Sequence, residues 1–199
     1  MQKIGITGGI GSGKTTVCRL FEALRVPVYY ADDAAKWLMN NDIPLIEAIK
    51  NALGSDVYNE QNQLQRAKLA AIIFKSAKDR RKLEKLVHPA VEQHFQQWVA
   101  AHKGEPYVLK EAALIFESGS YKRLDKVITV TAPIELRIQR VMQRDNVTAE
   151  QVIERIAAQM SDDEKKRMSN FVINNDGRTM LIPRVVDIHE QIMLSCSGL

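Results

Sequence analysis

The stretch GITGGIGSGKTT, residues 5–16, decides the fold of this 199-residue chain. From Gly8 to Thr15 it matches the phosphate-binding loop, or P-loop, pattern G-x-x-x-x-G-K-S/T. A short apolar stretch precedes the loop, and the helix-like stretch VCRLFEAL follows it. This order of strand, loop and helix is the context in which the pattern is specific. We therefore expect the loop to hold the phosphates of a nucleoside triphosphate.

Each residue type in the loop suits phosphate binding. Glycines have no Cβ, so the backbone N–H groups can turn inward around the phosphates. The helix that begins at Lys14 adds its partial positive charge, and the Lys14 side chain can reach the β- and γ-phosphates. The Thr15 hydroxyl can ligate Mg²⁺, the expected cofactor, and Thr16 can donate to an inner phosphate. The expected nucleotide-binding residues of the loop are Gly11, Ser12, Gly13, Lys14, Thr15 and Thr16.

Five short apolar stretches, rich in β-branched residues, alternate with stretches of helical spacing. This alternation predicts a parallel sheet with helices on both faces, and nearly all-apolar strands fit a sheet that is buried on both sides. We therefore expect an α/β fold of the P-loop NTPase type, with three layers and a central parallel sheet of five strands. The expected strands are residues 3–7, 26–30, 107–109, 126–131 and 171–173.

The connection between the second and third expected strands is much longer than a crossover needs. It runs for about 76 residues, whereas a minimal crossover takes about a dozen, and it contains at least three helical segments. We expect residues 41–103 to form a helical substrate lobe inserted into a single domain. The long helix pattern in this lobe should be interrupted at Pro89, which places His88 at a kink or boundary. The core then consists of residues 1–40, 104–136 and 169–199.

Three helices are expected after the fourth strand, because their starts are well marked. Pro133 suits a first helical turn, and two later segments, TAEQ from Thr148 and SDDE from Ser161, have the spacing of a capping box. We expect residues 137–168 to form a mobile helical lid that excludes water from the reaction.

Arg137, Arg140 and Arg144 recur at spacings of three and four, so they share one face of the first of these helices. A solvated face is the usual meaning of such a run. In small kinases, however, arginines at this point reach over the triphosphate and neutralise charge in the transition state. We assign Arg140 to catalysis and Arg144 to ATP binding.

Asp32 and Asp33 follow directly after the second expected strand. In an open parallel sheet the carboxyl ends of the strands face the ligand crevice, so a carboxylate there can orient an attacking hydroxyl or accept its proton. Either aspartate could instead be the N-cap of the following helix. We assign the catalytic role to Asp32, with the cap as its alternative, and the cap to Asp33. Glu111, after the third stretch, is the expected carboxylate that holds Mg²⁺ through water, against the alternative of a simple charge at a strand end.

The overall composition narrows the class of protein. With 28 Lys and Arg against 24 Asp and Glu, the net charge of +4 suits small anionic ligands and is too weak to indicate nucleic acid. The two cysteines show no metal or disulfide spacing, which favours a reducing, cytoplasmic setting. No apolar run approaches the roughly 18 residues of a membrane span, and the N-terminus does not have the pattern of a signal peptide. An NKxD-type guanine-reading motif is absent, so a small kinase that uses ATP is favoured.

The chain resembles the dephospho-CoA kinases, the enzymes of the last step of coenzyme A synthesis. The resemblance rests on the P-loop stretch, on ADDAA after the second strand, and on five later segments in the order of that family. It implies ATP-dependent phosphorylation of the 3′-hydroxyl of dephospho-CoA. The five segments are LQRAKLAAIIF, LVHPAV, ALIFESGSYKRLDKVITV, RIQRVMQRD and FVINNDG.

The resemblance also implies further site residues. Arg66, His88 and the loop around Glu117 would help to bind dephospho-CoA, and Asn175 would contact the adenine of ATP. A guanidinium such as that of Arg66 suits a phosphate or pyrophosphate through two parallel contacts. On residue type alone, Arg66 is more often a solvated helix residue. His88 could equally stabilise a kink, and Glu117 could equally cap the following turn.

Two positions depart from the pattern of the family, which commonly has an aspartate at position 30 and a proline at position 113. Here they are Tyr30 and Ala113. Because Asp32 matches the catalytic aspartate, the change at Tyr30 leaves the expected base in place, and the change at Ala113 bears on local turn geometry.

Three other classes of function stay open from the sequence. The first is another small-molecule or nucleoside monophosphate kinase, the second a nucleotide-binding regulatory module without turnover, and the third a nucleic-acid binder. The expected partners are ATP and dephospho-CoA, without nucleic acid or membrane, and the chain is expected to be a monomer or a weak homo-oligomer.

Overall fold

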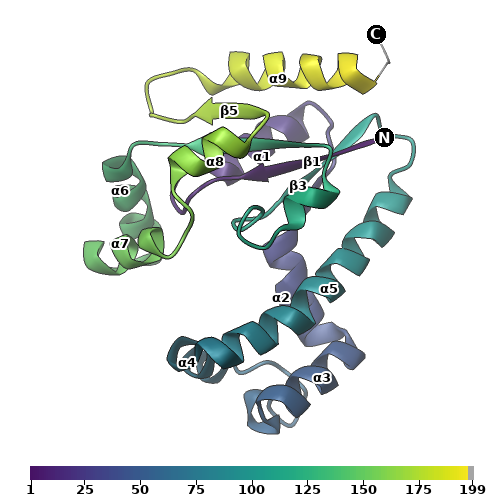
Figure 1. Ribbon diagram of the computed structural model, residues 1–199, viewed down its shortest axis with the longest axis vertical. Helices are drawn as coiled ribbons and strands as arrows, with labels where there is room; N and C mark the ends of the chain where they lie inside the picture. The colour runs from purple at the N-terminus through teal and green to yellow at the C-terminus, as the bar shows by residue number, and fades with distance from the viewer. Residues whose placement is uncertain (197–199) are drawn as a thin grey trace. The chain divides into compact units, whose positions relative to one another are not determined.

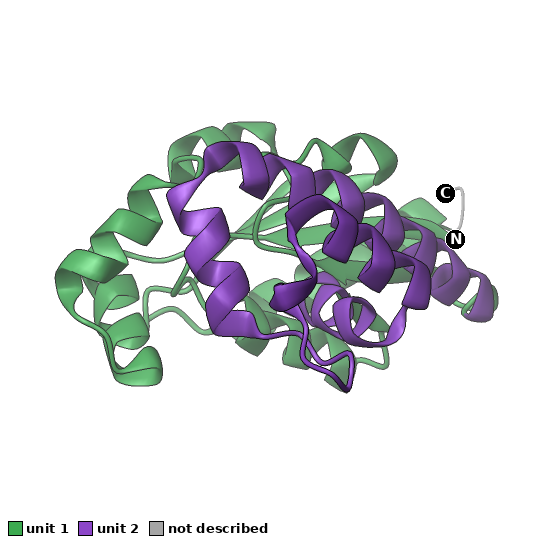
Figure 2. Ribbon diagram, turned by 90° about the horizontal axis from the view of Figure 1, so that it is seen from below, with its two compact units in different colours: residues 1–30, 102–199 green, residues 31–101 purple. Residues whose placement is uncertain are grey.

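The structure, a computed structural model, describes residues 1–196. They form two compact units, shown in different colours in Figure 2. Unit 1 joins Met1–Tyr30 to the segment that begins at His102, and unit 2 is Ala31–Ala101. Unit 2 starts ahead of residue 41, the boundary of the substrate lobe expected from the sequence.

Unit 1 is built on a parallel sheet of five strands, in the order β2-β3-β1-β4-β5. Strands β1, β3 and β5 of this sheet are labelled in Figure 1. This arrangement confirms the predicted α/β fold with its central parallel sheet. Every expected strand is present within two residues of its predicted bounds. The strands are β1 (Gln2–Thr7), β2 (Val28–Tyr30), β3 (Tyr107–Glu111), β4 (Lys126–Thr131) and β5 (Phe171–Asn174).

The two faces of the sheet are covered by different segments. On one face Ile4 and Ile6 of the central strand are fully buried in a cluster with residues of α1 (Lys14–Ala23) and α9 (Leu181–Cys196). On the other face, a Cβ added to Gly5 would lie 2.7 Å from the side chain of Leu124. Alternate residues of β1 therefore face opposite layers, as a sheet buried on both sides requires.

The three helices expected after the fourth strand are present, and both capping boxes are confirmed. Thr148 caps α7 (Ala149–Ala157) and Ser161 caps α8 (Asp162–Met168), each with the reciprocal bond from the third residue of its helix. Pro133 is the N-cap of α6 (Ile134–Asp145), one residue before the place expected for it. A short 3₁₀ helix, η2 (Ser120–Arg123), precedes β4.

Unit 2 is helical, and its helices pack around α5. Buried apolar side chains of α2, α3 and α5, including Leu38, Ile49 and Phe95, form its interior. The predicted interruption at Pro89 is wrong, because α5 continues through that residue, with α2, α3 and α4 packed against it. The elements are α2 (Ala31–Asn41), α3 (Ile43–Leu53), η1 (Ser55–Val57), α4 (Arg66–Lys75) and α5 (Ala77–Ala101). Among the described residues, no helix is both long and apolar enough to span a bilayer.

The two cysteines differ in burial, which leads to a prediction. Cys18 is fully buried in α1, and burial, with smaller effects from the charges of Glu111 and Glu22, raises the pKa of its thiol. Since the thiolate is the reactive form, we expect Cys18 to resist thiol reagents at pH 8. One thiol per chain, that of the partly exposed Cys196, should react in the folded protein, and the second only in denaturant. A Cys196→Ser variant that still reacts when folded would contradict this.

Candidate active site

The loop between β1 and α1 has a backbone conformation that strongly favours glycine at two positions. Gly11 has φ 79° and Gly13 has φ 92°, both in the left-handed region. Space is restricted as well, because an added Cβ would lie 2.5 Å from the carbonyl oxygen of Arg137 at Gly11, and 2.0 Å from Nδ2 of Asn175 at Gly13. Any side chain at either position would therefore distort the loop or displace its neighbours.

The N-terminus of α1 presents the groups that an anion needs. Gly13 is its N-cap, and none of the described side chains caps this end. The first-turn N–H groups and the positive end of the helix dipole therefore suit a phosphate. Thr15 and Thr16 are exposed in this first turn. Nζ of Lys14 donates to the carbonyl of Gly8 at 3.0 Å, so the side chain folds back along the loop.

Glu111 lies at the carboxyl end of β3, beside this loop. In the sheet it is paired with Ile6, next to the last residue of β1, and with Tyr30, the last residue of β2. It is 8% exposed. The charge of Glu111 raises the pKa of the Cys18 thiol and that of Lys14 lowers it, so both charged groups act on the same point of α1.

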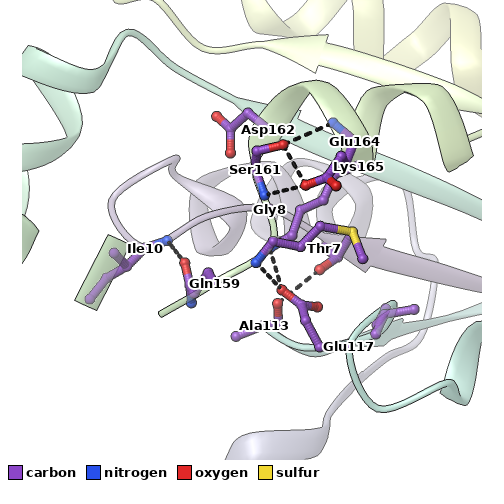
Figure 3. Close-up of polar contacts among 12 residues, drawn as sticks. Thr7, Gly8, Ile10, Ala113, Glu117, Gln159, Ser161, Asp162, Glu164 and Lys165 are labelled. Atoms are coloured by element: carbon purple, nitrogen blue, oxygen red, sulfur yellow. Dashed lines mark hydrogen bonds and ion pairs between the residues drawn. The ribbon is translucent and has the colours of Figure 1, made fainter. Parts of the chain in front are cut away.

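The two positions that depart from the family pattern both form hydrogen bonds within unit 1. The Tyr30 hydroxyl donates to Oε1 of Glu22 on α1 at 3.0 Å, and burial followed by this bond raises the pKa of the phenol. Ala113 follows β3, and its carbonyl accepts a bond of 3.1 Å from the hydroxyl of Thr7 (Figure 3). Both residues therefore form bonds at the carboxyl edge of the sheet.

The arginines of α6 lie in different surroundings, which the sequence spacing did not reveal. Arg137 is 5% exposed; its Nε donates to the carbonyl of Ile10 at 2.9 Å, and its Nη1 pairs with Asp162 at 2.9 Å. Arg140 is half-buried, and Nη1 reaches the carbonyl of Gly11 at 3.4 Å. Arg144 pairs with Asp145, and its side chain is 63% exposed. The helix thus directs its first two arginines at the P-loop and its third into solvent.

Asn175, directly after β5, is buried against the P-loop. Its Nδ2 donates to the carbonyl of Ser12 at 2.9 Å, and its own carbonyl accepts from Nη1 of Arg140 at 3.2 Å. These bonds account for the absence of space beside Gly13. The adenine contact expected from the resemblance stays a prediction.

The segment between α7 and α8 is tied to two other loops of unit 1 (Figure 3). Oε1 of Gln159 accepts from the N–H of Ile10 at 2.9 Å. Oε1 of Glu117 accepts from the N–H of Met160 at 3.0 Å and lies 3.0 Å from Nζ of Lys165, which is fully buried. Glu117, expected as a substrate residue, thus ties the segment between α7 and α8, and α8 itself, to the loop after β3. Sequence reasoning missed Lys165, since the charged run DDEKKRM gives no sign that one of its lysines is buried.

The remaining candidates lie in unit 2. Asp32 and Asp33 are exposed in the first turn of α2, and Asp33 pairs with Lys36 at 2.7 Å. The predicted capping role of Asp33 is wrong, because α2 begins two residues earlier, at Ala31. Arg66 begins α4, and His88 lies inside α5 before Pro89; both side chains are exposed.

The similarity to known proteins extends over nearly the whole chain. Residues 2–180 match the family model described as dephospho-CoA kinase. A Bacteroides fragilis protein of that name is 37% identical over 200 residues, which cover 98% of this chain and 97% of the relative. A solved structure from Thermus thermophilus has a TM-score of 0.85 at 32% identity and covers 96% of each chain. The dephospho-CoA kinase from Campylobacter jejuni has a TM-score of 0.70 at 25% identity, with 97% and 98% covered.

Proposed function

The chain belongs to the dephospho-CoA kinase family, and on this premise we propose that it transfers the γ-phosphoryl group of ATP to the 3′-hydroxyl of dephospho-CoA. The products are coenzyme A and ADP. The observation that carries the proposal is the P-loop geometry, with its left-handed glycines and uncapped helix start, within a chain that matches the model of this family over residues 2–180.

The donor side follows from the loop. We propose that residues 11–16 surround the phosphates, to which the N–H groups of Gly11, Gly13, Lys14 and Thr15 donate, because those of Ser12 and Thr16 donate to carbonyls of the loop. The Lys14 side chain would leave the Gly8 carbonyl to contact the β- and γ-phosphates. Arg144, exposed at the end of α6, would add a positive charge on the nucleotide side. Thr15 is exposed in the first turn of α1, which is the position expected of a residue that acts on bound phosphate.

The residues present fit Mg²⁺ held mainly by the substrate. Among residues 1–196, no group of three or more His, Cys, Asp or Glu is arranged around one point, so a cage made by the protein alone is not available in the described part of the chain. Mg²⁺ commonly uses one or two protein oxygens together with phosphates and water. We propose the Thr15 hydroxyl as a direct ligand and Glu111 as the carboxylate that acts through water. When held by these residues, Mg²⁺ would supply positive charge that neutralises the negative charge developing on the phosphates.

The acceptor side is proposed from unit 2. Asp32, exposed two residues after the end of β2, would align the ribose 3′-hydroxyl and take its proton. Arg66 would pair with a phosphate of dephospho-CoA, and His88 would contact the same substrate. We propose that residues 41–103 form the substrate lobe, with Glu117 contributing from the loop after β3.

The lid completes the site in this proposal. Residues 137–168 would exclude water, so that the phosphoryl group passes to the acceptor hydroxyl rather than to water. Arg140 would stabilise the transferring group, since its bonds to the P-loop and to Asn175, at 3.2–3.4 Å, are long for a charged donor. We also propose a cytoplasmic location and a monomer or weak homo-oligomer that acts on ATP and dephospho-CoA without nucleic acid.

The test is an assay of ADP release with ATP and Mg²⁺, in which dephospho-CoA is compared with adenosine, AMP and coenzyme A. We expect turnover with dephospho-CoA that exceeds the rate with every other acceptor by at least about a hundredfold. Adenosine and AMP lack most of the contacts of the whole substrate, and coenzyme A already carries a phosphate on its 3′-oxygen. A higher rate with AMP would indicate a nucleoside monophosphate kinase. ATP binding without ADP release from any acceptor would indicate a regulatory module.

A further inference from the structure

Three successive carbonyl groups of the P-loop are held from outside the loop. Nε of Arg137 donates to the carbonyl of Ile10 at 2.9 Å, and Nδ2 of Asn175 donates to that of Ser12 at 2.9 Å. The carbonyl between them, that of Gly11, receives the longer contact of 3.4 Å from Arg140. The donors come from α6 and from the end of β5, so elements distant in sequence converge on one short turn.

These bonds fix the direction of the N–H groups that follow. Every peptide bond in the described chain is trans, and in a planar trans peptide the C=O of one residue and the N–H of the next point in opposite directions. Holding the carbonyl of Ile10 therefore sets the N–H of Gly11, and holding that of Ser12 sets the N–H of Gly13. The intervening N–H, that of Ser12, donates to the carbonyl of Gly9 at 3.1 Å.

The two side chains that donate these bonds, Arg137 and Asn175, are buried. Arg137 is 5% exposed and its second branch pairs with Asp162 of α8, while Asn175 is 8% exposed and also contacts Arg140. Neither side chain can move without leaving a buried polar group unpaired. The turn itself is flexible in principle, because glycine at positions 8, 9, 11 and 13 restricts the backbone little.

We propose that Arg137 and Asn175 are positioning residues that hold the carbonyls of Ile10 and Ser12, so that the N–H groups of Gly11 and Gly13 stay directed at the phosphates of the bound nucleotide. This inference rests on the proposed function only in that the loop binds a nucleoside triphosphate. It gives Asn175 a role through the P-loop in place of the adenine contact expected from the resemblance.

The experiment compares two ligands that share phosphates and differ in adenine, namely ATP and inorganic tripolyphosphate, each with Mg²⁺. Dissociation constants are measured by calorimetry for the wild type, Asn175→Leu and Arg137→Lys. Leucine matches the size of asparagine without a donor or a new charge, and lysine keeps the positive charge but loses the fork that reaches Ile10 and Asp162 together. Asn51→Leu, at an exposed position of α3, and Arg184→Lys, at an exposed position of α9, are the matched controls.

We expect both test variants to bind ATP and tripolyphosphate about fivefold to tenfold more weakly, by the same factor for the two ligands, as the loss of one or two oriented donors implies. The controls should match the wild type. A loss confined to ATP would place Asn175 against adenine and overturn the proposal. Unchanged affinities with a lowered melting temperature would assign both residues a purely structural role, and would also overturn it.

The two variants and the two ligands together distinguish the possible outcomes. If Asn175→Leu does not fold, Arg137→Lys decides the question through the same comparison of ligands. If the wild type fails to phosphorylate dephospho-CoA, the proposed function falls, while the binding of tripolyphosphate still reports on the loop. The positioning role is therefore supported or overturned independently of the acceptor.

Discussion

Replacing Lys14 with alanine is expected to lower kcat/KM for phosphorylation of dephospho-CoA by at least about a thousandfold. Phosphoryl transfer spreads negative charge over the transferring group and the leaving oxygen, and a fixed cation aimed at that charge is worth most where water is excluded. Nζ of Lys14 lies at the loop, 3.0 Å from the carbonyl of Gly8, within the segment that surrounds the phosphates. Steady-state kinetics with varied ATP should show a fall in kcat as well as a rise in the KM for ATP.

Lys103→Ala is the matched control for this substitution. Lys103 is exposed and precedes β3, so it lies at the amino end of a strand whose carboxyl end borders the P-loop. Removal of its charge changes the net charge by the same amount at a distance from the phosphates. Equal activity of the Lys14 and Lys103 variants would show that the P-loop lysine has no specific part in the reaction.

The core of the fold could be predicted from the sequence because its signals are local. Short β-branched stretches that are apolar almost throughout can bury both of their faces only inside a sheet that is covered on both sides. The two capping boxes, at Thr148 and Ser161, are equally local, since each needs only a hydroxyl and an acceptor three residues later. Predictions of this kind do not depend on what packs against the segment.

Predictions that depend on distant partners were less successful. Proline inside a helix costs about 3 kcal/mol, which argues for an interruption at Pro89. Helix α5 nevertheless continues, because α2, α3 and α4 pack along it and their combined burial outweighs a local penalty. The burial of Lys165 beside Glu117 belongs to the same class, since its partner is distant in sequence.

The predictions about the candidate site divide in the same way, into those made from local signals and those that depend on distant partners. The P-loop could be located from the spacing of its residues, and Gly11 and Gly13 have the left-handed backbone conformation that favours glycine. Binding of phosphate by these residues stays a prediction. The spacing of Arg137, Arg140 and Arg144 placed them on one helix face but could not show that the first is buried. Only the packing of α6 against the loop distinguishes a residue that holds the carbonyl of Ile10 from one that is exposed to solvent.

Replacing Asp32 with asparagine is expected to lower kcat by about a hundredfold to ten-thousandfold while leaving the affinity for ATP within about threefold of the wild type. Asparagine keeps the shape of the side chain and can still orient a hydroxyl, but it cannot accept the proton. The loss should therefore appear in turnover at saturating ATP and dephospho-CoA, measured by ADP release. ATP affinity should change little, because the P-loop, rather than the first turn of α2, binds the phosphates.

The Asp33→Asn variant is the control that separates proton acceptance by Asp32 from the electrostatic effect of any carboxylate at the start of α2. Both aspartates are exposed in the first turn of α2, and both substitutions remove one negative charge next to the same helix dipole. Asp33 already pairs with Lys36 at 2.7 Å, so its loss should change kcat by less than about twofold, as exposed ion pairs contribute little. Similar losses in the two variants would mean that the charge of the helix start matters and that neither carboxylate is the base. A large loss in the Asp32 variant alone would support Asp32 as the group that accepts the proton of the acceptor hydroxyl, since both substitutions remove the same charge from the same helix turn.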